Sequence, residues 1–507
     1  MLTLSDLRPL TDYLIQIANL QSAASVLSWD QETYMPRGGN GARAEALATL
    51  QGLAHERFTA PEMEELLWRW VDVDSGAVLD PEADEPARAV LREVLRDYRR
   101  AKRLPTPFVS HLEKTCALAH EAWVLAREKR DYALFRPHLT AIVALKREEA
   151  AYLGYAETAY DALLDAFEPG MTASSLTPLF AELKPQLSAL LARIRDSSVR
   201  PAPLPAGPYD AQRQLAFGSL LLSAMGYRFD RGRLDQSAHP FTTGFHPTDV
   251  RLTTRISTED VTSSLFSCLH EGGHGLYDQG LDPAHYGTPL GEAVSLGMHE
   301  SQSRLWENCV GRSIELWRHF YPLLRQAFPG PLAHVSLEGF HAAINTVSPS
   351  LIRVEADELT YNFHIIVRYE LEQQLIAGQL SPADLPHAWN EAMHATLGVT
   401  PRDDGEGVLQ DIHWAHGAFG YFPTYTLGNL YAAQFWQQAQ RDLADLPTLI
   451  EGGHLEPLAS WLRDRVHRWG RTHASDTLLR RITGEPLNPE HFITYLEGKF
   501  AAVYRLA

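Results

Sequence analysis

The sequence predicts a mostly α-helical fold with one small β insertion. Two observations support the helices: apolar residues recur with a period near 3.6 over most of the chain, and Pro- and Gly-containing breaks separate the periodic segments. The periodic segments before the first long break lie at roughly residues 5–58, 61–70, 82–103, 107–166 and 173–195. A Pro-rich crossing at residues 200–208 precedes a further helix at about 210–225.

The β insertion is predicted at residues 249–257, where apolar and polar side chains alternate as they do on a strand with one polar face. Helical periodicity returns after residue 258 and continues to the last helix, which Asn488 caps with Pro489 at its first position. No internal repeat interrupts this pattern. We therefore expect a single domain over residues 1–507, with a helical N-terminal part of about 1–200, the crossing at 200–208 and a catalytic part of about 209–507.

Composition excludes several classes of protein. The chain has 507 residues, 45% of them hydrophobic, and no apolar run near 18 residues, so we expect an ample core and no membrane span. A net charge of -18 argues against nucleic acid as a partner. The three cysteines are too few for a disulfide framework, and the first residues lack the features of a secretory signal. The expected compartment is the cytoplasm.

The segment His270-Glu-Gly-Gly-His274 contains the most informative chemistry. On a helix, residues four apart lie one above the other, so two imidazoles can share one metal. Glu271 lies about 100° around the same helix, close enough to take a proton from an attacking water. Acidic residues at 259–260 and an apolar body favour a buried helix. The alternative is two core histidines around an accidental glutamate.

Gly272 and Gly273 each cost about 1 kcal/mol of helix propensity, so we expect a substrate chain or a neighbouring helix to approach the backbone there.

A third metal ligand has to come from further along the chain. The position six residues after His274 is Gly280, which excludes a third histidine there. A carboxylate from a second helix is the other common solution. Glu300 is the best candidate because it lies in the middle of a predicted helix, where an unpaired carboxylate would be costly. The other carboxylates considered are Asp278, Asp282, Glu292 and Glu307.

Glu292 is the second choice as ligand, and Asp278 suits an acceptor for the second N–H of His274. His299 is expected to be a neighbour of the metal site and not a ligand.

Three further segments are unusually polar. Residues 351–368 place Arg353, Asp357, His364 and Arg368 along one helical stripe. A solvated face with an Arg353–Asp357 pair is one interpretation. The other is a buried wall that presents a guanidinium to an anionic substrate group, because Arg binds a carboxylate through two parallel hydrogen bonds. Arg251 and Arg255 compete for that role.

Residues 239–246 form the second polar segment, which is predicted to be either a loop near the site or a turn.

Residues 405–425 form the third segment, a glycine-rich and therefore mobile loop that contains His413, His416, Tyr421 and Tyr425. A second metal site is conceivable there but lacks ligand spacing. Hydrogen-bond donors for a developing oxyanion fit the segment better, because acyl-transfer sites need such donors.

Together these segments resemble the carboxypeptidase Taq family of metallocarboxypeptidases, over essentially the whole chain. The resemblance is carried by six ordered motifs, which are His239-Pro-Phe241, Asp249-Val-Arg-Leu-Thr253, His270-Glu-Gly-Gly-His274, His299-Glu-Ser-Gln302, Ile352-Arg353 with Ala356-Asp357, and Gly407-Val-Leu-Gln-Asp-Ile-His-Trp414. It implies an elongated helical fold with a deep active-site groove, similar to that of neurolysin and angiotensin-converting enzyme, and a homodimer. It also implies zinc as cofactor, with cobalt in some members.

The resemblance assigns a role to each matched residue. His270, His274 and Glu300 match the metal ligands, and Glu271 matches the general base. Arg353 matches the anchor for the terminal carboxylate of the substrate. His413 and Tyr421 match transition-state contacts, with Tyr425 as the alternative tyrosine.

The implied activity is the removal of single C-terminal residues from peptides, with broad specificity and proline disfavoured. An endo-acting zinc oligopeptidase on the same fold is the alternative, and a catalytically silent metal-binding scaffold is a third possibility.

Overall fold

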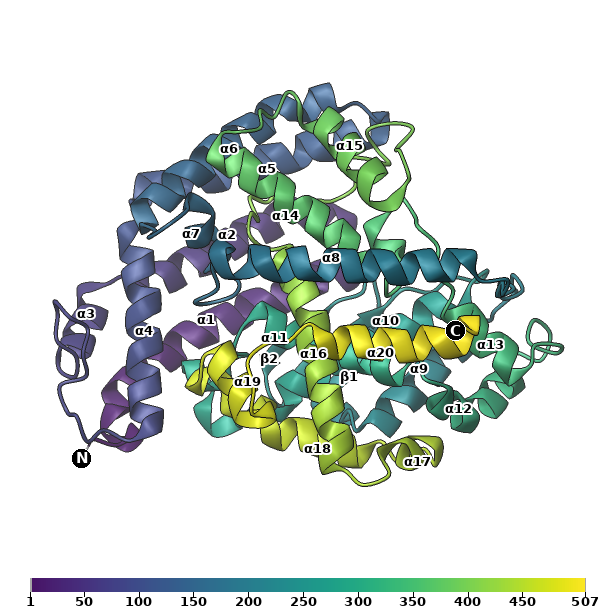
Figure 1. The fold of residues 1–507 in the computed structure, drawn as a ribbon. Helices are drawn as coiled ribbons and strands as arrows, with labels where there is room; N and C mark the ends of the chain where they lie inside the picture. Colours follow the sequence, from purple (N-terminus) through teal and green to yellow (C-terminus); the bar gives the residue numbers. More distant parts are fainter. Residues whose placement is uncertain (1, 507) are drawn as a thin grey trace. The chain divides into compact units, whose positions relative to one another are not determined.

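The computed structural model describes residues 2–506, and most of them are helical, as the sequence predicts (Figure 1). The chain divides into two compact units. The first contains the residues up to Lys102, Pro203–Ile344 and Ala432–Leu487, and the second contains Arg103–Ala202, Asn345–Tyr431 and the residues from Asn488 onward. Within residues 2–506, no helix is both long and apolar enough to cross a membrane.

The first unit contains helices from three separate stretches of the chain and the only sheet among the described residues. Its helices are α1 (Arg8–Thr33), α2 (Asn40–Phe58), α3 (Pro61–Trp68), α4 (Glu85–Arg103), α9 (Ala211–Met225), α10 (Val261–Gly280), α11 (Leu296–Arg304), α12 (Ile314–Ala327), α13 (Leu337–Ile344), α17 (Leu446–Glu451), α18 (Glu456–Arg465) and α19 (Ser475–Thr483). Its strands are β1 (Gly232–Gln236), β2 (Thr242–His246) and β3 (Asp249–Thr254).

The second unit contains helices and loops but no strand among its described residues. Its helices are α5 (Thr106–Lys129), α6 (Tyr132–Leu153), α7 (Ala159–Leu164), α8 (Ala173–Asp196), α14 (Tyr361–Ala377), α15 (Leu385–Leu397) and α20 (Glu490–Tyr504). Helix α16 (Pro423–Asp442) begins in this unit and ends in the first.

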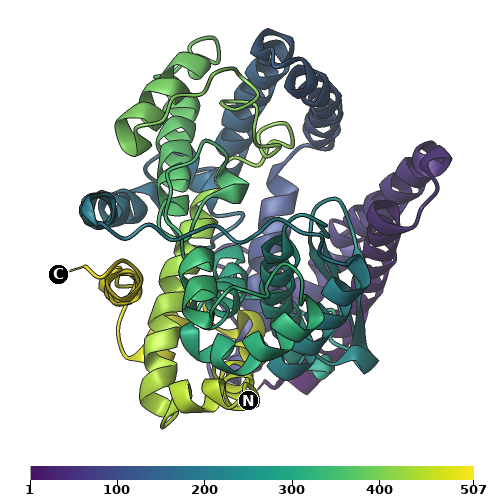
Figure 2. The same ribbon diagram turned by 90° about the vertical axis from the view of Figure 1, so that its right-hand side faces the viewer.

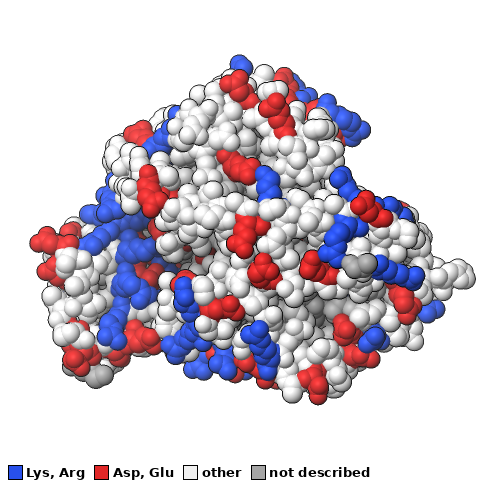
Figure 3. Space-filling view, viewed as in Figure 1, with Lys and Arg blue, Asp and Glu red and all other residues white. Residues whose placement is uncertain are grey.

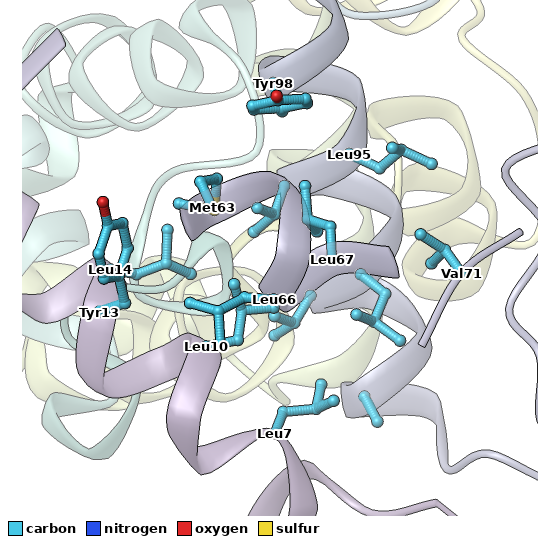
Figure 4. Packing of buried hydrophobic residues seen from close by; sticks show 14 of the residues in the cluster. Leu7, Leu10, Tyr13, Leu14, Met63, Leu66, Leu67, Val71, Leu95 and Tyr98 are labelled. Atoms are coloured by element: carbon cyan, nitrogen blue, oxygen red, sulfur yellow. The ribbon is translucent and has the colours of Figure 1, made fainter. Parts of the chain in front are cut away.

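An apolar cluster joins the N-terminal helices of the first unit. Leucines from α1, α3 and α4 point toward one another in Figure 4, and Leu10, Leu67 and Leu91 have no exposed surface. Their spacing along each helix places them on one stripe, which is the periodicity seen in the sequence. The outer face of α4 is arginine-rich, and Lys and Arg side chains gather over this helix in Figure 3.

The β insertion has three strands, whereas the sequence analysis predicted one. Their order is β1-β3-β2, with β3 parallel to β1 and antiparallel to β2. The predicted strand is the central one, β3. The two outer strands were missed because they are only five residues long and lack clear alternation.

The polar face of the sheet packs against α1. The guanidinium carbons of Arg251 and Arg233 lie 4.4 Å and 5.2 Å from the ring centroid of Trp29. Arg233 and Arg251 are direct neighbours on β1 and β3.

Two predicted long helices are interrupted. The segment at 5–58 divides into α1 and α2, which lie side by side in both views, because Pro36 and the following glycines break it (Figure 2). The segment at 107–166 divides into α5, α6 and α7. Arg130 adopts a left-handed conformation with φ of 56° after α5, and Asp131 caps α6 by accepting a hydrogen bond from the backbone N–H of Ala133.

Candidate metal centre and substrate-binding residues

Helix α10 carries the two histidines of the His-Glu-Gly-Gly-His motif. The helix begins at Val261, where Asp260 accepts a hydrogen bond of 2.8 Å from the backbone N–H of Thr262, and it ends at Gly280. His270 and His274 are one turn apart, with ring centroids 5.0 Å from each other. The helix that the sequence predicted is therefore present, and both imidazoles lie on the same face of it.

Glu300 of α11 completes the group. Its Oε2 lies 3.3 Å from Nε2 of His274 and 3.7 Å from Nε2 of His270, and the ligand atoms of all three residues lie within 4.8 Å of one another. Ligands at about 2.0–2.1 Å from a tetrahedral zinc ion are separated by roughly 3.4 Å. The donor set and its spacing therefore fit a divalent metal, and two nitrogens with one carboxylate leave a coordination position for water or substrate.

The orientation of Glu300 is fixed by its neighbours. Arg304 Nε donates a hydrogen bond of 2.6 Å to Oε1, and Ser303 Oγ donates one of 3.1 Å to Oε2. Burial opposes ionisation of this carboxyl, but Arg304 and the two histidines hold its pKa well below the ordinary value. Glu300 is therefore an anion whose Oε2 faces both imidazoles.

Glu271 is buried next to this group. Thr242 of β2 donates a hydrogen bond of 2.7 Å to Oε2 of Glu271, and its hydroxyl oxygen also lies 3.1 Å from the backbone oxygen of Glu271. Burial raises the pKa of Glu271, while His270 and the Thr242 hydroxyl act in the opposite direction. A raised pKa is the property that a carboxylate needs to accept a proton from water and release it afterwards.

Glu307 makes a contact with the metal site that the sequence analysis did not predict. It was considered as a ligand, but its Oε2 lies 2.9 Å from Nδ1 of His270, on the side of the ring opposite Nε2. Burial opposes ionisation of Glu307, and Arg304 and His270 lower its pKa to about 2. An ionised carboxylate at this position accepts the Nδ1 proton, and this leaves the Nε2 lone pair free for a metal.

The prediction for Asp278 was wrong. Asp278 accepts a hydrogen bond of 2.9 Å from Nε2 of His299 and does not contact His274. Residue 278 lies one turn beyond residue 274 on the same helix face, where side chains can interact. In the structure, however, the Asp278 carboxylate bonds to His299, a residue of the neighbouring helix α11. Glu292 pairs with Arg471 at 3.1 Å and is not part of the group formed by His270, His274 and Glu300.

The segment after Glu300 changes helix type. Residues Leu305–Val310 form a π-helix, and the backbone N–H of Gly311 bonds to the carbonyl of Trp306, five residues earlier. Such wide turns are rare and occur frequently at functional sites. Glu307 lies inside this turn, so the altered turn determines where its carboxylate reaches.

The two glycines of the motif allow helices to pack closely. A Cβ on Gly273 would lie 2.5 Å from the backbone oxygen of Gln302 and 2.6 Å from Cα of Ser303, both in α11. A Cβ on Gly272 would meet the side chains of Leu222 and Met225 in α9. Of the two approaches expected from the sequence, the structure shows the neighbouring helix.

The other predicted site residues lie in the second unit, around Arg353. This arginine is buried, and its Nε donates to Asp411 at 2.8 Å and its Nη1 to the hydroxyl of Tyr361 at 2.9 Å. The predicted helical stripe over 351–368 is wrong, because α14 begins only at Tyr361. Asp357 does not pair with Arg353; it accepts hydrogen bonds from the backbone N–H groups of Leu359 and Thr360.

Asp411 joins two buried guanidinium groups. Its second oxygen accepts a hydrogen bond of 2.7 Å from Nε of Arg368, which has no exposed surface. Burial opposes ionisation of Asp411, but Arg353 and Arg368 hold its pKa far below the ordinary value. Two buried positive charges therefore pair with one buried carboxylate, so Arg353 and Arg368 do not lie on a solvated face.

His413 and the two candidate tyrosines lie together in the same unit. Nε2 of His413 lies 3.2 Å from the hydroxyl of Tyr425, and the His413 and Tyr421 rings have centroids 5.2 Å apart. The guanidinium carbon of Arg353 lies 5.0 Å from the Tyr425 ring centroid. Burial, together with Arg353 and Arg368, lowers the pKa of His413 to about 3, although Asp411 acts against this. His413 is therefore a neutral imidazole at pH 7.

The glycine-rich loop around His413 is anchored by Glu372 of α14. Its carboxylate accepts hydrogen bonds from Trp414 Nε1 at 2.8 Å, from the backbone N–H of Gly420 at 3.0 Å and from the hydroxyl of Tyr160 at 2.8 Å. Gly420 has a φ of 90°, a conformation that favours glycine. His416 lies against His120 at 5.2 Å between ring centroids, and in the described residues neither belongs to a group with metal-ligand spacing.

The competing arginines, Arg251 in β3 and Arg255 directly after that strand, bond to other residues. Arg251 forms two hydrogen bonds of 2.9 Å with Asp249, and Arg255 donates to the hydroxyl of Ser263 at 3.3 Å. Phe241, in the weak motif before β2, pairs through its backbone N–H with the hydroxyl of Thr253. From Thr242 onward the segment forms β2, and Thr242 bonds to Glu271, so the segment supports the sheet and also lies beside the candidate metal centre.

Two histidines four residues apart, a carboxylate from the next helix and a buried glutamate beside them define a metal-dependent hydrolase of the HExxH class. The family model described as carboxypeptidase Taq (M32) metallopeptidase matches residues 9–500. The chain belongs to this family, and it is a metallocarboxypeptidase.

Similar proteins support the same conclusion. The chain is 46% identical over 506 residues to thermostable carboxypeptidase 1 of Thermus thermophilus, with 98% of each chain covered. It is 38% identical over 498 residues to carboxypeptidase 1 of Bacillus subtilis, again with 98% of each covered. The crystal structure of the M32 carboxypeptidase from Deinococcus radiodurans has a TM-score of 0.94 at 37% identity, covering 98% of this chain and 99% of that one. These findings favour the carboxypeptidase over the endo-acting oligopeptidase.

Proposed function

We propose that His270, His274 and Glu300 hold the catalytic metal ion and that Glu271 is the general base. The observation that carries this proposal is the clustering of three ligand atoms within 4.8 Å, with Glu271 directly adjacent in sequence. A divalent metal held there supplies a Lewis acid that polarises the scissile carbonyl and acidifies water. Glu271 accepts the proton of the attacking water and passes it to the leaving amine, aided by the raised pKa that burial gives it.

We propose that Arg353 binds the terminal carboxylate of the peptide. Its Nε and one Nη1 proton are engaged by Asp411 and Tyr361, and these contacts hold the guanidinium plane in place. A fixed guanidinium recognises a carboxylate through charge and direction together. His413 and Tyr421 are proposed as transition-state contacts, with Tyr425 as the alternative because its hydroxyl is already 3.2 Å from His413.

The metal proposed is zinc, and cobalt is the alternative. The donor set of two imidazoles and one carboxylate suits zinc, and borderline nitrogen ligands also accept cobalt. Metal analysis of the purified enzyme, before and after His274→Ala, tests both the metal and the site. Full metal content in the His274→Ala enzyme would overturn the ligand assignment.

The cellular setting is also a proposal. We propose a homodimer, as the family resemblance implies, and a cytoplasmic single-domain protein, as composition and the helical pattern of the sequence suggest. Sedimentation equilibrium of the purified enzyme tests the dimer, and a monomer at micromolar concentration would contradict it. Cell fractionation tests the compartment.

A further inference from the structure

Four aromatic rings stack in a column that begins at a proposed metal ligand. The rings of His274 and His299 are nearly parallel, with an interplanar angle of 15° and centroids 4.5 Å apart. His299 stacks in turn against Tyr277 at 5.1 Å and 20°, and Tyr277 stacks against His467 at 4.8 Å and 28°. We call these four residues the ring column. It links α10, α11 and the segment that follows α18 within the first unit.

Each of the three rings beyond His274 is held by a hydrogen bond of its own. Nε2 of His299 is fixed by Asp278, and Nε2 of His467 lies 2.8 Å from Oε1 of Gln302. The hydroxyl of Tyr277 accepts a hydrogen bond from the backbone N–H of Val294. Three of the four rings therefore have a defined orientation independent of any metal.

The two proposed histidine ligands are held in different ways. His270 has a carboxylate, Glu307, on its Nδ1. His274 has none: its Nδ1 is buried and has no hydrogen-bond partner among residues 2–506. Nε2 of His274 faces Glu300, so neither ring nitrogen is bonded to a residue that fixes the ring plane from behind. The protein can therefore orient this ring only through contacts with its flat face, and His299 lies against that face.

We propose that His299 is a positioning residue that sets the ring plane of His274 through stacking. The inference rests on the proposed role of His274 as a metal ligand. A metal–imidazole bond needs the nitrogen lone pair, which lies in the ring plane, to point at the ion. Rotation of the ring about its bond to Cβ turns the lone pair away, and the parallel ring of His299 opposes that rotation. Asp278 contributes indirectly, because its hydrogen bond to Nε2 fixes the orientation of the His299 ring.

The test compares three variants of the full-length enzyme by zinc affinity. His299→Leu removes the ring, His299→Phe retains a ring without the bond to Asp278, and His387→Leu is the control, because the His387 side chain is 79% exposed. Zinc dissociation constants are measured by competition with a chelator. Loss of a partner that orients a ligand costs about 10–100-fold in metal affinity. We expect such a loss for His299→Leu, a clearly smaller one for His299→Phe and none for the control.

The cobalt-loaded enzymes give a second readout. The visible absorption bands of cobalt report ligand geometry, so His299→Leu should alter them while His299→Phe keeps them close to those of the wild type. Wild-type affinity and an unchanged spectrum in His299→Leu would overturn the inference. Equal losses in both variants would also overturn it, because they would show that the bond to Asp278, and not the ring, matters.

One further variant, His274→Ala, separates this inference from the proposed ligand set. If His274→Ala leaves zinc affinity unchanged, the ligand assignment itself is wrong. If His274→Ala abolishes binding and His299→Leu does not weaken it, only the positioning role fails. Should His299→Leu not fold, Asp278→Leu and Asp278→Asn replace it, since Asn retains an oxygen acceptor for His299. Asp278→Leu is then expected to bind zinc more weakly than Asp278→Asn, and equal affinities would contradict the proposal.

Discussion

The hydroxyl of Thr242 donates a hydrogen bond of 2.7 Å to Oε2 of Glu271, so a residue of strand β2 orients the proposed base on helix α10. Thr242→Val removes the hydroxyl and keeps the shape of the side chain. A hydrogen bond to a charged group contributes about 1.5–3 kcal/mol, so kcat should fall at least roughly tenfold with little change in KM. Thr242→Ser should restore most of the rate. Steady-state kinetics on a free-acid peptide test this, and near-normal turnover of Thr242→Val would contradict it.

Glu271→Gln should retain the metal and lose most activity. Glu271 is not among the three ligand residues, and Gln cannot accept the proton of the attacking water. General-base catalysis contributes about 10²–10⁴-fold, so a loss of kcat in that range is expected. Metal content measured on the same preparation is the control. Turnover close to that of the wild type would remove Glu271 from the mechanism.

Arg353→Gln should raise KM and reduce discrimination between a free-acid peptide and its C-terminal amide. The wild-type enzyme is expected to cleave only the free acid, because the amide offers no charge to the guanidinium. Arg255→Gln is the matched control, since Arg255 is exposed and bonds only to a serine hydroxyl in the described contacts. Mass spectrometry of both peptides after digestion gives the readout. Equal wild-type rates on the two peptides would exclude carboxylate recognition.

Gly273→Ala should destabilise the protein, whereas Gly52→Ala should not. The added methyl at 273 meets the backbone of α11 at 2.5–2.7 Å, and overpacking typically costs about 1–3 kcal/mol. Gly52 lies in α2 with open space around it, so Ala there should stabilise the helix by about 0.5–1 kcal/mol. Urea unfolding of both variants measures the difference. A neutral Gly273→Ala would show that α10 and α11 are not in close contact.

Stability should fall in acid partly because of His364. Burial, followed by the charge of Arg368, lowers its pKa to about 3, against an ordinary value of 6.5. Between those two values the unfolded chain binds a proton that the folded protein does not. Stability from this residue is therefore complete above pH 6.5 and is lost as pH falls toward 3, by at most about 1.4 kcal/mol per pH unit.

His364→Leu should consequently lose less stability than the wild type between pH 7 and pH 5, by up to about 2 kcal/mol. The raised pKa of Glu372, about 7, works in the opposite direction because the folded state binds that proton more tightly. This carboxyl is present in both proteins, so its effect cancels in the comparison. Urea midpoints at the two pH values measure the change, with the exposed His387 replaced as control. Parallel pH profiles of wild type and His364→Leu would contradict the assignment.

The fold class and the clustering of His270, His274 and Glu300 could be predicted from the sequence because both depend largely on short-range geometry. The spacing of His270 and His274 determines their common face on any helix, and a 3.6-residue period determines which side of a helix is buried. Glu300 was predicted as the third member of the group for two reasons. No histidine lies six residues after His274, and a carboxylate in the middle of a helix would be costly if it were buried without a partner. The resemblance of six motifs to a known family then predicted the carboxypeptidase activity.

The contacts around the ligands could not be predicted in the same way. Asp278 was assigned to His274 by spacing along α10, but the rotation of α11 brought His299 to it instead. Glu307 reaches His270 from a π-helix, and nothing in the local sequence marks that change of helix type. Arg353 pairs with Asp411, 58 residues away, and lies in the short 3-10 helix Arg353–Glu355 before α14 begins. Such pairings depend on how helices and loops pack against one another, and the local periodicity of the sequence gives no information on that packing.

The pairing of Arg353 and Arg368 with Asp411 has a consequence for selectivity. Among the described residues, Asp411 is the one carboxylate in a direct ion pair with either guanidinium, so two buried cations share one ion-paired anion. If Arg353 receives the end of the peptide, the carboxylate of the substrate supplies a second anion for this pair of cations. A peptide without a free C-terminal carboxylate would then bind poorly for an electrostatic reason and not because of its shape. Its binding would remove water from the Arg353 guanidinium without supplying an anion in return.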